Sequence, residues 1–452
     1  MLLNEGHTPL LEKPGKYSLL NSVKSLSKNP KEFWLLYLVE ILTICPFSIS
    51  VISTTLYTTR ILFFTDIQSG LIMGSFGLVI GVMTIILSSL PARFGLRLSL
   101  LLSCSMGIVF NILMTLSFHR YIQLALMATI FLPSTAISII TLKLSVKLYT
   151  YQDNRSVGYS LFYMVFFTAG GLAGGVVDLV LHERSTLLEP YQQLMITNMC
   201  LYSIGLVVSL FMRNLDIGES GEKVLEFKRN ESNWQYLKEV FVTARFWRFF
   251  LLISLLTVIK SMYFHLTATL PLYVKRDYGE EKHFGILMGA HQAVLLLFIP
   301  ILTGLIRYFD FYNLVILGSL STAVSPFVLF FEDSFFMLGV FVVVLSIGEA
   351  IYAPRLVDFT LEAAPKGKEA IYLGLANMPN SIGLLVTGIS SGLLMNEYCP
   401  ATGERDCYLV WIFIGLYCLV VCFFVIVFKK YFNQKNEDDV SAEMKDTSNQ
   451  LL

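Results

Sequence analysis

Long apolar stretches of this sequence contain ionisable side chains, where a charge is costly to keep, and six of these are candidates for solute binding or proton transfer. They are Glu40, Lys143, Lys260, His265, His291 and Glu349. Carboxylates and ammonium groups can bind a solute of opposite charge, and an unperturbed imidazole titrates near neutral pH. We therefore expect binding of a charged solute and transfer of protons.

Glu349 and Lys260 lie near the middle of their apolar stretches, which favours direct contact with a solute over a structural ion pair. Lys143 is a further candidate for solute binding, although its side chain could instead reach the membrane surface. Glu40 should lie at the depth of Lys143 and could form an ion pair with it that breaks when Glu40 takes up a proton. His265 and His291 complete the proton-coupling candidates, with a structural role for each as the alternative.

A second charged group is expected to form a gate on the cytoplasmic side. Arg355, Asp358 and Glu362 follow one another at spacings of three and four residues, which places them on one face of a helix. Arg355 can pair with either acid. Arg93 and Arg97, at the start of a loop between apolar stretches, are assigned to the same gate.

The elements that would position these residues are transmembrane helices. Of the 452 residues, 55% are hydrophobic and 15% are charged, well below the charged fraction of a soluble domain. A helix needs about 20 apolar residues to cross a bilayer, and such runs occur twelve times. The runs are 33–58, 69–90, 97–117, 122–146, 157–181, 193–212, 247–273, 284–306, 312–331, 335–361, 370–395 and 408–429. The sequence therefore predicts an all-α membrane protein with twelve transmembrane helices in two six-helix halves.

The predicted organisation has five parts. They are a cytoplasmic tail (1–32), a first half (33–212), a cytoplasmic linker (213–246), a second half (247–429) and a disordered cytoplasmic tail (430–452). Within the linker, 233–242 has helical apolar spacing and is expected to lie along the membrane surface. The glycines of 170–175 are expected to permit close helix packing.

Basic residues decide the orientation. With both ends in the cytoplasm, the cytoplasmic segments hold 23 Lys and Arg residues and the outer loops hold seven. Cys399 and Cys407 then lie in an outer loop, where a disulfide between them can persist. The Asn-x-Ser sequons at Asn154 and Asn230 fall inside and should not be glycosylated.

The layout of six helices, a long cytoplasmic loop and six more helices resembles the major facilitator superfamily, whose substrate site lies between the halves. The loop 88–97 is similar to a motif of that superfamily. Arg93, Gly95 and Arg97 match the motif, while Ala92 replaces its acid. In the family that acid helps to latch the halves together.

Two further segments resemble the proton-dependent oligopeptide transporters. The matching residues are Gly348-Glu349, Phe359-Thr360, Ala364-Pro365, Phe162-Tyr163 and the glycine-rich stretch 169–175. The resemblance implies that Glu349 meets the amino group of a peptide and that Lys143 corresponds to a lysine of the fourth span. The chain departs from the family at Leu35 and Leu36, which replace an acid and an arginine, and at Phe167, which replaces an asparagine.

These observations predict a secondary active transporter of a small organic solute that works by alternating access. Proton coupling and a peptide or amino-acid-like substrate are expected, with protons as the only cofactor-like species. A receptor or scaffold of the same fold that does not transport is the alternative. No Walker loop, zinc-ligand spacing or nucleophile elbow is present, so no enzyme is expected. The zero net charge gives no indication of nucleic acid as a partner. The partners expected are the bilayer and a small molecule, and the membrane could be the plasma membrane or an endolysosomal one.

Overall fold

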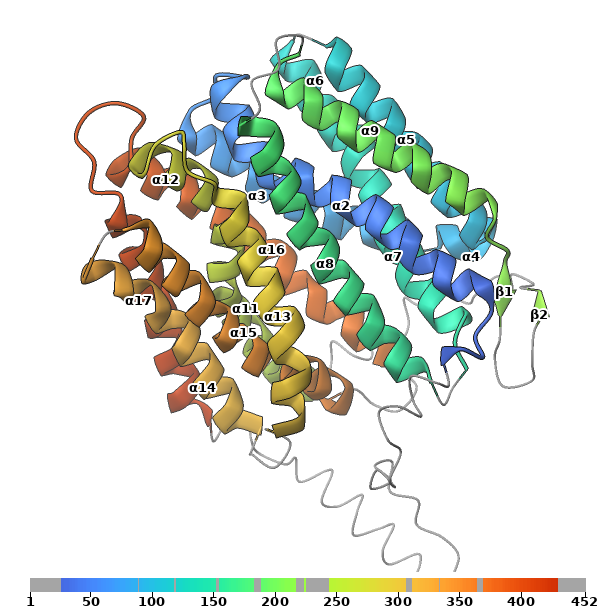
Figure 1. Cartoon of the computed structure of the whole chain (residues 1–452). Helices are drawn as coiled ribbons and strands as arrows, with labels where there is room; N and C mark the ends of the chain where they lie inside the picture. Colours follow the sequence, from blue (N-terminus) through green and yellow to red (C-terminus); the bar gives the residue numbers. More distant parts are fainter. Residues whose placement is uncertain are drawn as a thin grey trace, which may run out of the picture.

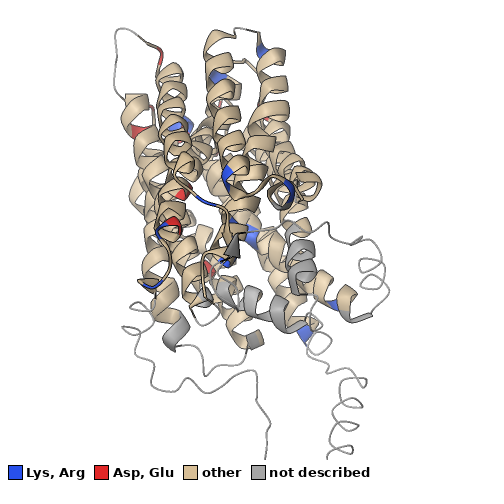
Figure 2. Ribbon diagram, turned by 90° about the vertical axis from the view of Figure 1, so that its right-hand side faces the viewer, with Lys and Arg blue, Asp and Glu red and all other residues tan. Residues whose placement is uncertain are grey.

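The computed structural model describes residues 26–87, 89–117, 119–151, 154–182, 188–216, 223–224, 244–305, 311–332, 334–363 and 369–429. Twelve of its helices are long and apolar enough to cross a membrane, which confirms the predicted all-α fold class. Charged residues are sparse along these helices, as Figure 2 shows. The chain is a multi-pass membrane protein.

In the described part of the first half, eight α-helices and one π-helical segment follow one another (Figure 1). Its elements are α2 (Lys31–Arg60), α3 (Asp66–Leu87), α4 (Leu90–Phe94), α5 (Leu96–Leu116), α6 (Arg120–Leu126), η1 (Met127–Phe131), α7 (Leu132–Leu148), α8 (Arg155–His182) and α9 (Pro190–Leu210). α6, η1 and α7 run on as one membrane span, interrupted by the π-helical turn of η1. π-Helical turns are rare in proteins, and many of those that exist lie at functional sites.

A short ribbon follows the first half: β1 (Leu215–Asp216) pairs antiparallel with β2 (Lys223–Val224). The second half then contains α11 (Ala244–Ala268), α12 (Leu270–Asp277), α13 (Phe284–Leu305), α14 (Phe311–Val324), η3 (Ser325–Phe330), α15 (Phe335–Ala363), α16 (Glu369–Tyr398) and α17 (Tyr408–Val427). The predicted run 247–273 is divided here, because a new helix with Pro271 in its first turn starts at Leu270.

Parts of the predicted organisation lie outside the described residues. These are most of the N-terminal tail, the linker segment 233–242 with the sequon at Asn230, and the C-terminal tail from residue 430 onward. The boundaries of the tails, halves and linker stay predictions.

The two halves touch along two helix pairs, α3 with α16 and α8 with α13. Glycines allow the close approach. A Cβ atom on Gly174 would lie 2.6 Å from the backbone oxygen of Gly285, and one on Gly74 would lie 2.8 Å from that of Leu385. Both distances are too short for a side chain, so the predicted packing role of the glycine-rich stretch is confirmed at Gly174.

The ends of the bundle are named here by their landmarks. The disulfide end carries the bonded pair Cys399 and Cys407, which the sequence predicted. The tail end carries Lys31 at the start of α2 and Lys429 just after α17. In Figure 1 the disulfide end is at the top.

Candidate functional site

Three predicted binding residues come together from both halves. Lys143 lies on α7 of the first half, while Lys260 on α11 and Glu349 on α15 belong to the second half. Lys260 is within electrostatic range of both Lys143 and Glu349. The Lys143 side chain is accessible at its surface, although many protein atoms lie around it. Lys260 is half-buried. Two cations and one anion from both halves therefore form one electrostatically linked group, with Lys260 in common.

Each of these charges lacks a strong partner of its own. Lys260 has its Nζ 5.8 Å from the ring centroid of Phe264, a distance that gives a cation–π contact. Lys143 forms no ion pair within the described part of the chain. Glu349 is buried at 7% exposure, and its Oε2 accepts no hydrogen bond from a described residue. Buried charges normally have hydrogen-bonded partners, so the free Glu349 Oε2 is available to a bound solute.

Glu349 and His291 are placed to share a proton. His291 Nδ1 lies 2.8 Å from Ser346 Oγ, and that hydroxyl donates its own hydrogen to the Val342 carbonyl at 2.6 Å. With Nδ1 as the donor, the neutral ring has a bare Nε2. This Nε2 lies 3.5 Å from Glu349 Oε2. Neither atom has a hydrogen-bond partner among the described residues, so a proton on either group would lie between two acceptors.

Glu40 is placed differently from the prediction. It is fully buried on α2, and neither carboxylate oxygen has a hydrogen-bond partner among the described residues. It is within electrostatic range of Tyr37 and Tyr163, but the structure does not bring it into ion-pair contact with Lys143. Its proton-coupling role stays a prediction.

His265 has a complete set of partners away from Glu349. Its Nδ1 lies 2.8 Å from Thr269 Oγ1, and its Nε2 lies 3.2 Å from Ser390 Oγ. Thr269 donates its hydroxyl hydrogen to Ser391, so its oxygen can accept from the ring. A neutral His265 therefore joins α11 to α16, which supports the structural alternative for this residue.

At the tail end, the predicted gate makes no described contact between the halves. Arg93 and Arg97 are exposed at the junction of α4 and α5. Gly95 between them has a φ of +88°, and a Cβ atom there would lie 2.6 Å from the Asn214 side chain, so glycine is required. Arg355, Asp358 and Glu362 lie on α15, but their side chains are outside the described set.

Glu32, which stands at the start of the first span, has a structural partner. Arg213 Nε lies 2.5 Å from its Oε1, and the Glu32 side chain is fully buried. This pair ties the beginning of α2 to the segment after α9, entirely within the first half.

The disulfide end holds a latch that the sequence did not predict, and its two ion pairs join the halves. Asp66 at the start of α3 receives two hydrogen bonds from Arg276, at 2.7 and 2.8 Å. Arg60 at the end of α2 gives two to Glu280, at 2.6 and 2.8 Å. The first pair is buried, with side-chain exposures of 9% and 10%, while the second is exposed at 38% and 62%. The Arg60 hydrogen bonds hold the pKa of Glu280 below its ordinary 4.5.

The disulfide loop is part of this latch. Arg276 donates to the Cys399 carbonyl at 2.8 Å, and its own backbone oxygen accepts from Arg405 at 2.6 Å. Arg276 thus connects α3 of the first half with the loop closed by Cys399 and Cys407.

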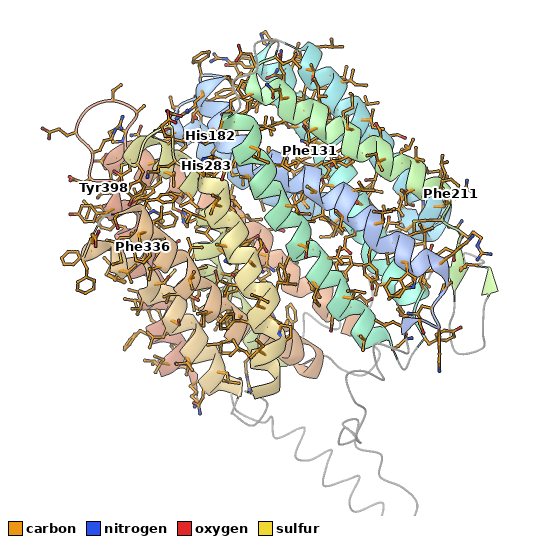
Figure 3. The ribbon with its side chains drawn as sticks, in the orientation of Figure 1. Phe131, His182, Phe211, His283, Phe336 and Tyr398 are labelled. Carbon is orange, nitrogen blue, oxygen red and sulfur yellow. A yellow bond between two sulfur atoms is a disulfide. The ribbon has the colours of Figure 1, made fainter. Side chains whose placement is uncertain are left out.

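Asp178 supplies a third link between the halves. Its carboxylate accepts hydrogen bonds from the backbone amides of Gly285 and Ile286, at 2.9 and 2.8 Å. These amides belong to the first turn of α13, whose unpaired N–H groups favour an anion. Beside it the rings of His182 and His283 stack 3.7 Å apart (Figure 3).

His182 lies between two acceptors. Its Nδ1 is 2.9 Å from the Asp178 carbonyl and its Nε2 is 3.2 Å from the Glu281 carbonyl. Both ring nitrogens can donate only in the imidazolium form.

The latch residues could not be recognised from one sequence. Arg60, Asp66, Arg276 and Glu280 appear there as ordinary charges of short loops. Their only signal is opposite charge in loops on the same side of the membrane, which does not identify the partners.

Comparison with known proteins agrees with this geometry. The family model of the Major Facilitator Superfamily matches residues 262–449. No curated protein sequence matches the chain. A crystal structure of a POT family transporter in complex with a thioalcohol-conjugated peptide is 15% identical, with a TM-score of 0.74 over 90% of this chain and 97% of that one. A POT family transporter in complex with 5-aminolevulinic acid gives 16% identity, the same TM-score and the same coverage.

The nucleoside transporter NupG is also similar, at 17% identity and a TM-score of 0.67 over 88% of this chain and 99% of that one. These matches extend over nearly the whole length of both chains, and at such low identity they concern the fold. The chain therefore has the fold of major facilitator transporters, and the resemblance to that superfamily and to its POT members, which the sequence motifs indicated, is confirmed.

Proposed function

We propose that this protein is a secondary active transporter that carries a small zwitterionic solute, peptide or amino-acid-like, between its two halves. The observation that supports this most is the group of Lys143, Lys260 and Glu349, in which charges from both halves lie within electrostatic range of Lys260. The carboxylate of the solute would bind between the lysines. Its amino group would bind Glu349, whose Oε2 has no partner among the described residues.

A solute held by both halves can couple its own binding to their movement. Lys143 repels Lys260 when nothing lies between them, and an anionic group placed there removes that repulsion. The solute then favours conformations in which the halves approach each other around it. A scaffold that does not transport has no need for such an arrangement.

The contacts between the halves differ at the two ends of the bundle, and this difference indicates toward which end the site opens. Three links close the disulfide end: Asp66 with Arg276, Arg60 with Glu280, and Asp178 with the start of α13. At the tail end, no ion pair joins the halves within the described ranges. With the disulfide outside and both chain ends in the cytoplasm, as the distribution of basic residues predicts, this is the cytoplasm-facing state.

Proton coupling is proposed for the pair formed by His291 and Glu349. A proton on Glu349 weakens its attraction for the amino group of the solute, and a proton on His291 leaves the carboxylate free to bind it. Release of the solute and movement of the proton are therefore linked through one carboxyl group. The POT transporters of similar fold, described with a peptide or with 5-aminolevulinic acid, support a substrate that carries both an amino and a carboxyl group.

Uptake into proteoliposomes tests this proposal. Labelled di- and tripeptides and 5-aminolevulinic acid should accumulate when the pH gradient is imposed and should exchange without accumulation when it is absent. Glu349→Gln should abolish accumulation, while Glu332→Gln, an exposed glutamate of the same half, should leave it unchanged. Peptide transport that persists unaltered in Glu349→Gln would remove the assigned role of this residue. Absence of both flux and thermal stabilisation across a broad panel of solutes would favour the receptor or scaffold function instead.

A further inference from the structure

The first half encloses a second pocket, separate from the charges between the halves. It lies among α2, α3, α5, η1 and α9 and has a volume of about 40 Å³. Its lining residues are Ser50, Ser53, Thr54, Tyr57, Phe76, Phe110, Asn111, Met114, Met127, Phe131, Tyr191, Leu194, Met195 and Asn198. This volume holds about three water-sized particles, since one needs roughly 10–15 Å³.

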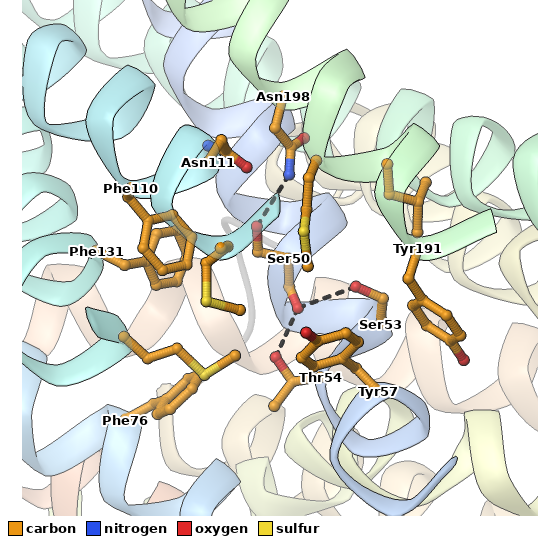
Figure 4. Close-up of a pocket in the computed structure, with 14 residues that line it drawn as sticks. Ser50, Ser53, Thr54, Tyr57, Phe76, Phe110, Asn111, Phe131, Tyr191 and Asn198 are labelled. Carbon is orange, nitrogen blue, oxygen red and sulfur yellow. Dashed lines mark hydrogen bonds between the residues drawn. The ribbon is translucent and has the colours of Figure 1, made fainter. Parts of the chain in front are cut away.

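Two amide groups in this pocket have unused acceptors. Asn111 and Asn198 are 1% and 3% exposed, and the Oδ1 atom of each has no hydrogen-bond partner among the described residues. Each amide nitrogen already donates one of its two hydrogens: Asn111 Nδ2 to the Gly107 carbonyl at 2.8 Å, and Asn198 Nδ2 to Ser50 Oγ at 3.1 Å. Figure 4 shows the two amides at the same end of the pocket, beside Ser50. A buried carbonyl oxygen without a donor is costly, which indicates a missing occupant.

The hydroxyl groups of the pocket also give their hydrogens away from it. Ser50 donates to the Pro46 carbonyl at 3.0 Å, Ser53 to the Ile49 carbonyl at 2.8 Å, and Thr54 to the Ser50 carbonyl at 2.6 Å. The Tyr57 hydroxyl donates to Gln123 Oε1 at 2.8 Å. Each of these polar side chains can therefore only accept from an occupant.

The pocket wall favours positive charge in a second way. Three phenylalanine rings, those of Phe76, Phe110 and Phe131, line the pocket and are nearly fully buried. Aromatic faces attract cations, most strongly where water is excluded. Phe131 and Met127 are the two ends of the π-helical turn η1, so this irregular turn helps to form the wall.

We propose that this pocket binds one small monovalent cation through neutral oxygen atoms, with Asn111 Oδ1 and Asn198 Oδ1 as its principal ligands. The occupant is a cation because the oriented polar groups offer acceptors. It is monovalent because the lining contains no acidic residue to balance a second charge. Na⁺ matches these ligands, since carbonyl and hydroxyl oxygens coordinate it in transporters, and a small ammonium ion shares the same chemistry.

Two tyrosine rings form the wall of the pocket nearest the disulfide end. The ring centroids of Tyr57 and Tyr191 lie 5.4 Å apart, and Tyr191 is half-buried and within electrostatic range of Arg60. Arg60 belongs to the latch, where Glu280 pairs with its positive charge.

Thermal unfolding of the purified full-length protein in nanodiscs tests the proposal. Melting temperatures are compared in NaCl, KCl, methylammonium chloride and choline chloride at equal concentration. A saturable rise of a few degrees in Na⁺ or methylammonium, with none in the bulky choline, is expected. Binding of radioactive Na⁺ at equilibrium provides a second measurement that does not depend on unfolding.

Three variants make the assignment specific. Asn198→Leu should weaken the apparent cation affinity at least about tenfold, because it removes one ligand. Asn111→Asp should strengthen it, because a carboxylate adds charge to the same ligand position. Ser319→Ala, which removes a buried unpaired hydroxyl from α14 in the other half, should leave it unchanged.

The outcomes separate clearly. Equal melting temperatures in every salt, with no bound Na⁺, would mean that ordered water fills the pocket and would overturn the proposal. An apparent cation affinity that Asn198→Leu leaves unchanged would also overturn it. The measurements need neither a transported solute nor a pH gradient, so they stand if the proposed transport function fails.

Discussion

Asp66→Asn should shift the equilibrium toward an open disulfide end far more than Glu280→Gln does, although each variant removes one carboxylate from a latch ion pair. The Asp66 pair with Arg276 is about nine-tenths buried and has two charge-assisted hydrogen bonds. Removal of one partner from a buried ion pair costs about 3–5 kcal/mol, because the other charge is left uncompensated. Arg276 keeps its bond to the Cys399 carbonyl, which favours the lower value.

The cost applies to one conformation only. Asp66 and Arg276 lie in different halves, so they separate when the disulfide end opens and both become hydrated. A loss of about 3 kcal/mol therefore moves the equilibrium toward the open disulfide end by about two powers of ten. Glu280 is 62% exposed in its pair with Arg60, and such a pair contributes about 1 kcal/mol or less, a shift of at most about fivefold.

Distances between two nitroxide labels measure this equilibrium directly. Labels at Gln68 and Lys282 lie on exposed positions of the two halves at the disulfide end, in a background without the free cysteines. Double electron–electron resonance in nanodiscs should show a new longer distance in Asp66→Asn and a nearly native distribution in Glu280→Gln. The double exchange Asp66→Arg with Arg276→Asp should restore the short distance. Equal populations in the two single variants would refute the reasoning from burial.

Three further predictions concern other groups. His182→Ala should lengthen the same label distance, because it removes the contact of the His182 ring with the Glu281 carbonyl of the other half. Glu280 should add a pH dependence to closure only in acid, because its pKa in the closed state lies below its ordinary 4.5. Its contribution is present above that ordinary value and is lost only as the pH falls through the lowered one. Gly174→Leu should prevent close contact of α8 with α13 and lower the melting temperature by several degrees, whereas Gly175→Leu, with no atom within 4 Å of the added Cβ, should have little effect. His291→Ala should separate proton movement from solute movement, leaving exchange in proteoliposomes while abolishing accumulation driven by the pH gradient.

The spans and their grouping could be predicted from the sequence because hydrocarbon imposes a length and a composition on every helix that crosses it. The buried charges were found for the same reason, since Lys260 and Glu349 stand out in apolar runs. Their mutual proximity depends on how α11 packs beside α15, which no local pattern reveals.

The sequence was less informative about the partners of polar groups. His265 and His291 look alike in apolar runs, yet one bridges Thr269 and Ser390 while the other faces Glu349. The difference arises from hydroxyl groups on neighbouring helices that pack beside each ring. Asn111 and Asn198 could not be singled out from the sequence, because neutral amides are common in membrane helices. They become informative only when the structure shows which of their hydrogen bonds are made.

The disulfide loop is a surface through which a binding protein could fix the conformation of the disulfide end. Residues 401–406 at its tip are exposed, and Arg405 of this tip and Cys399 at the base both bond to Arg276. An antibody fragment or nanobody that binds this tip would hold Arg276 in the orientation that pairs with Asp66. Such a binder would arrest the protein without entering the membrane, and reduction of the disulfide would release the arrest.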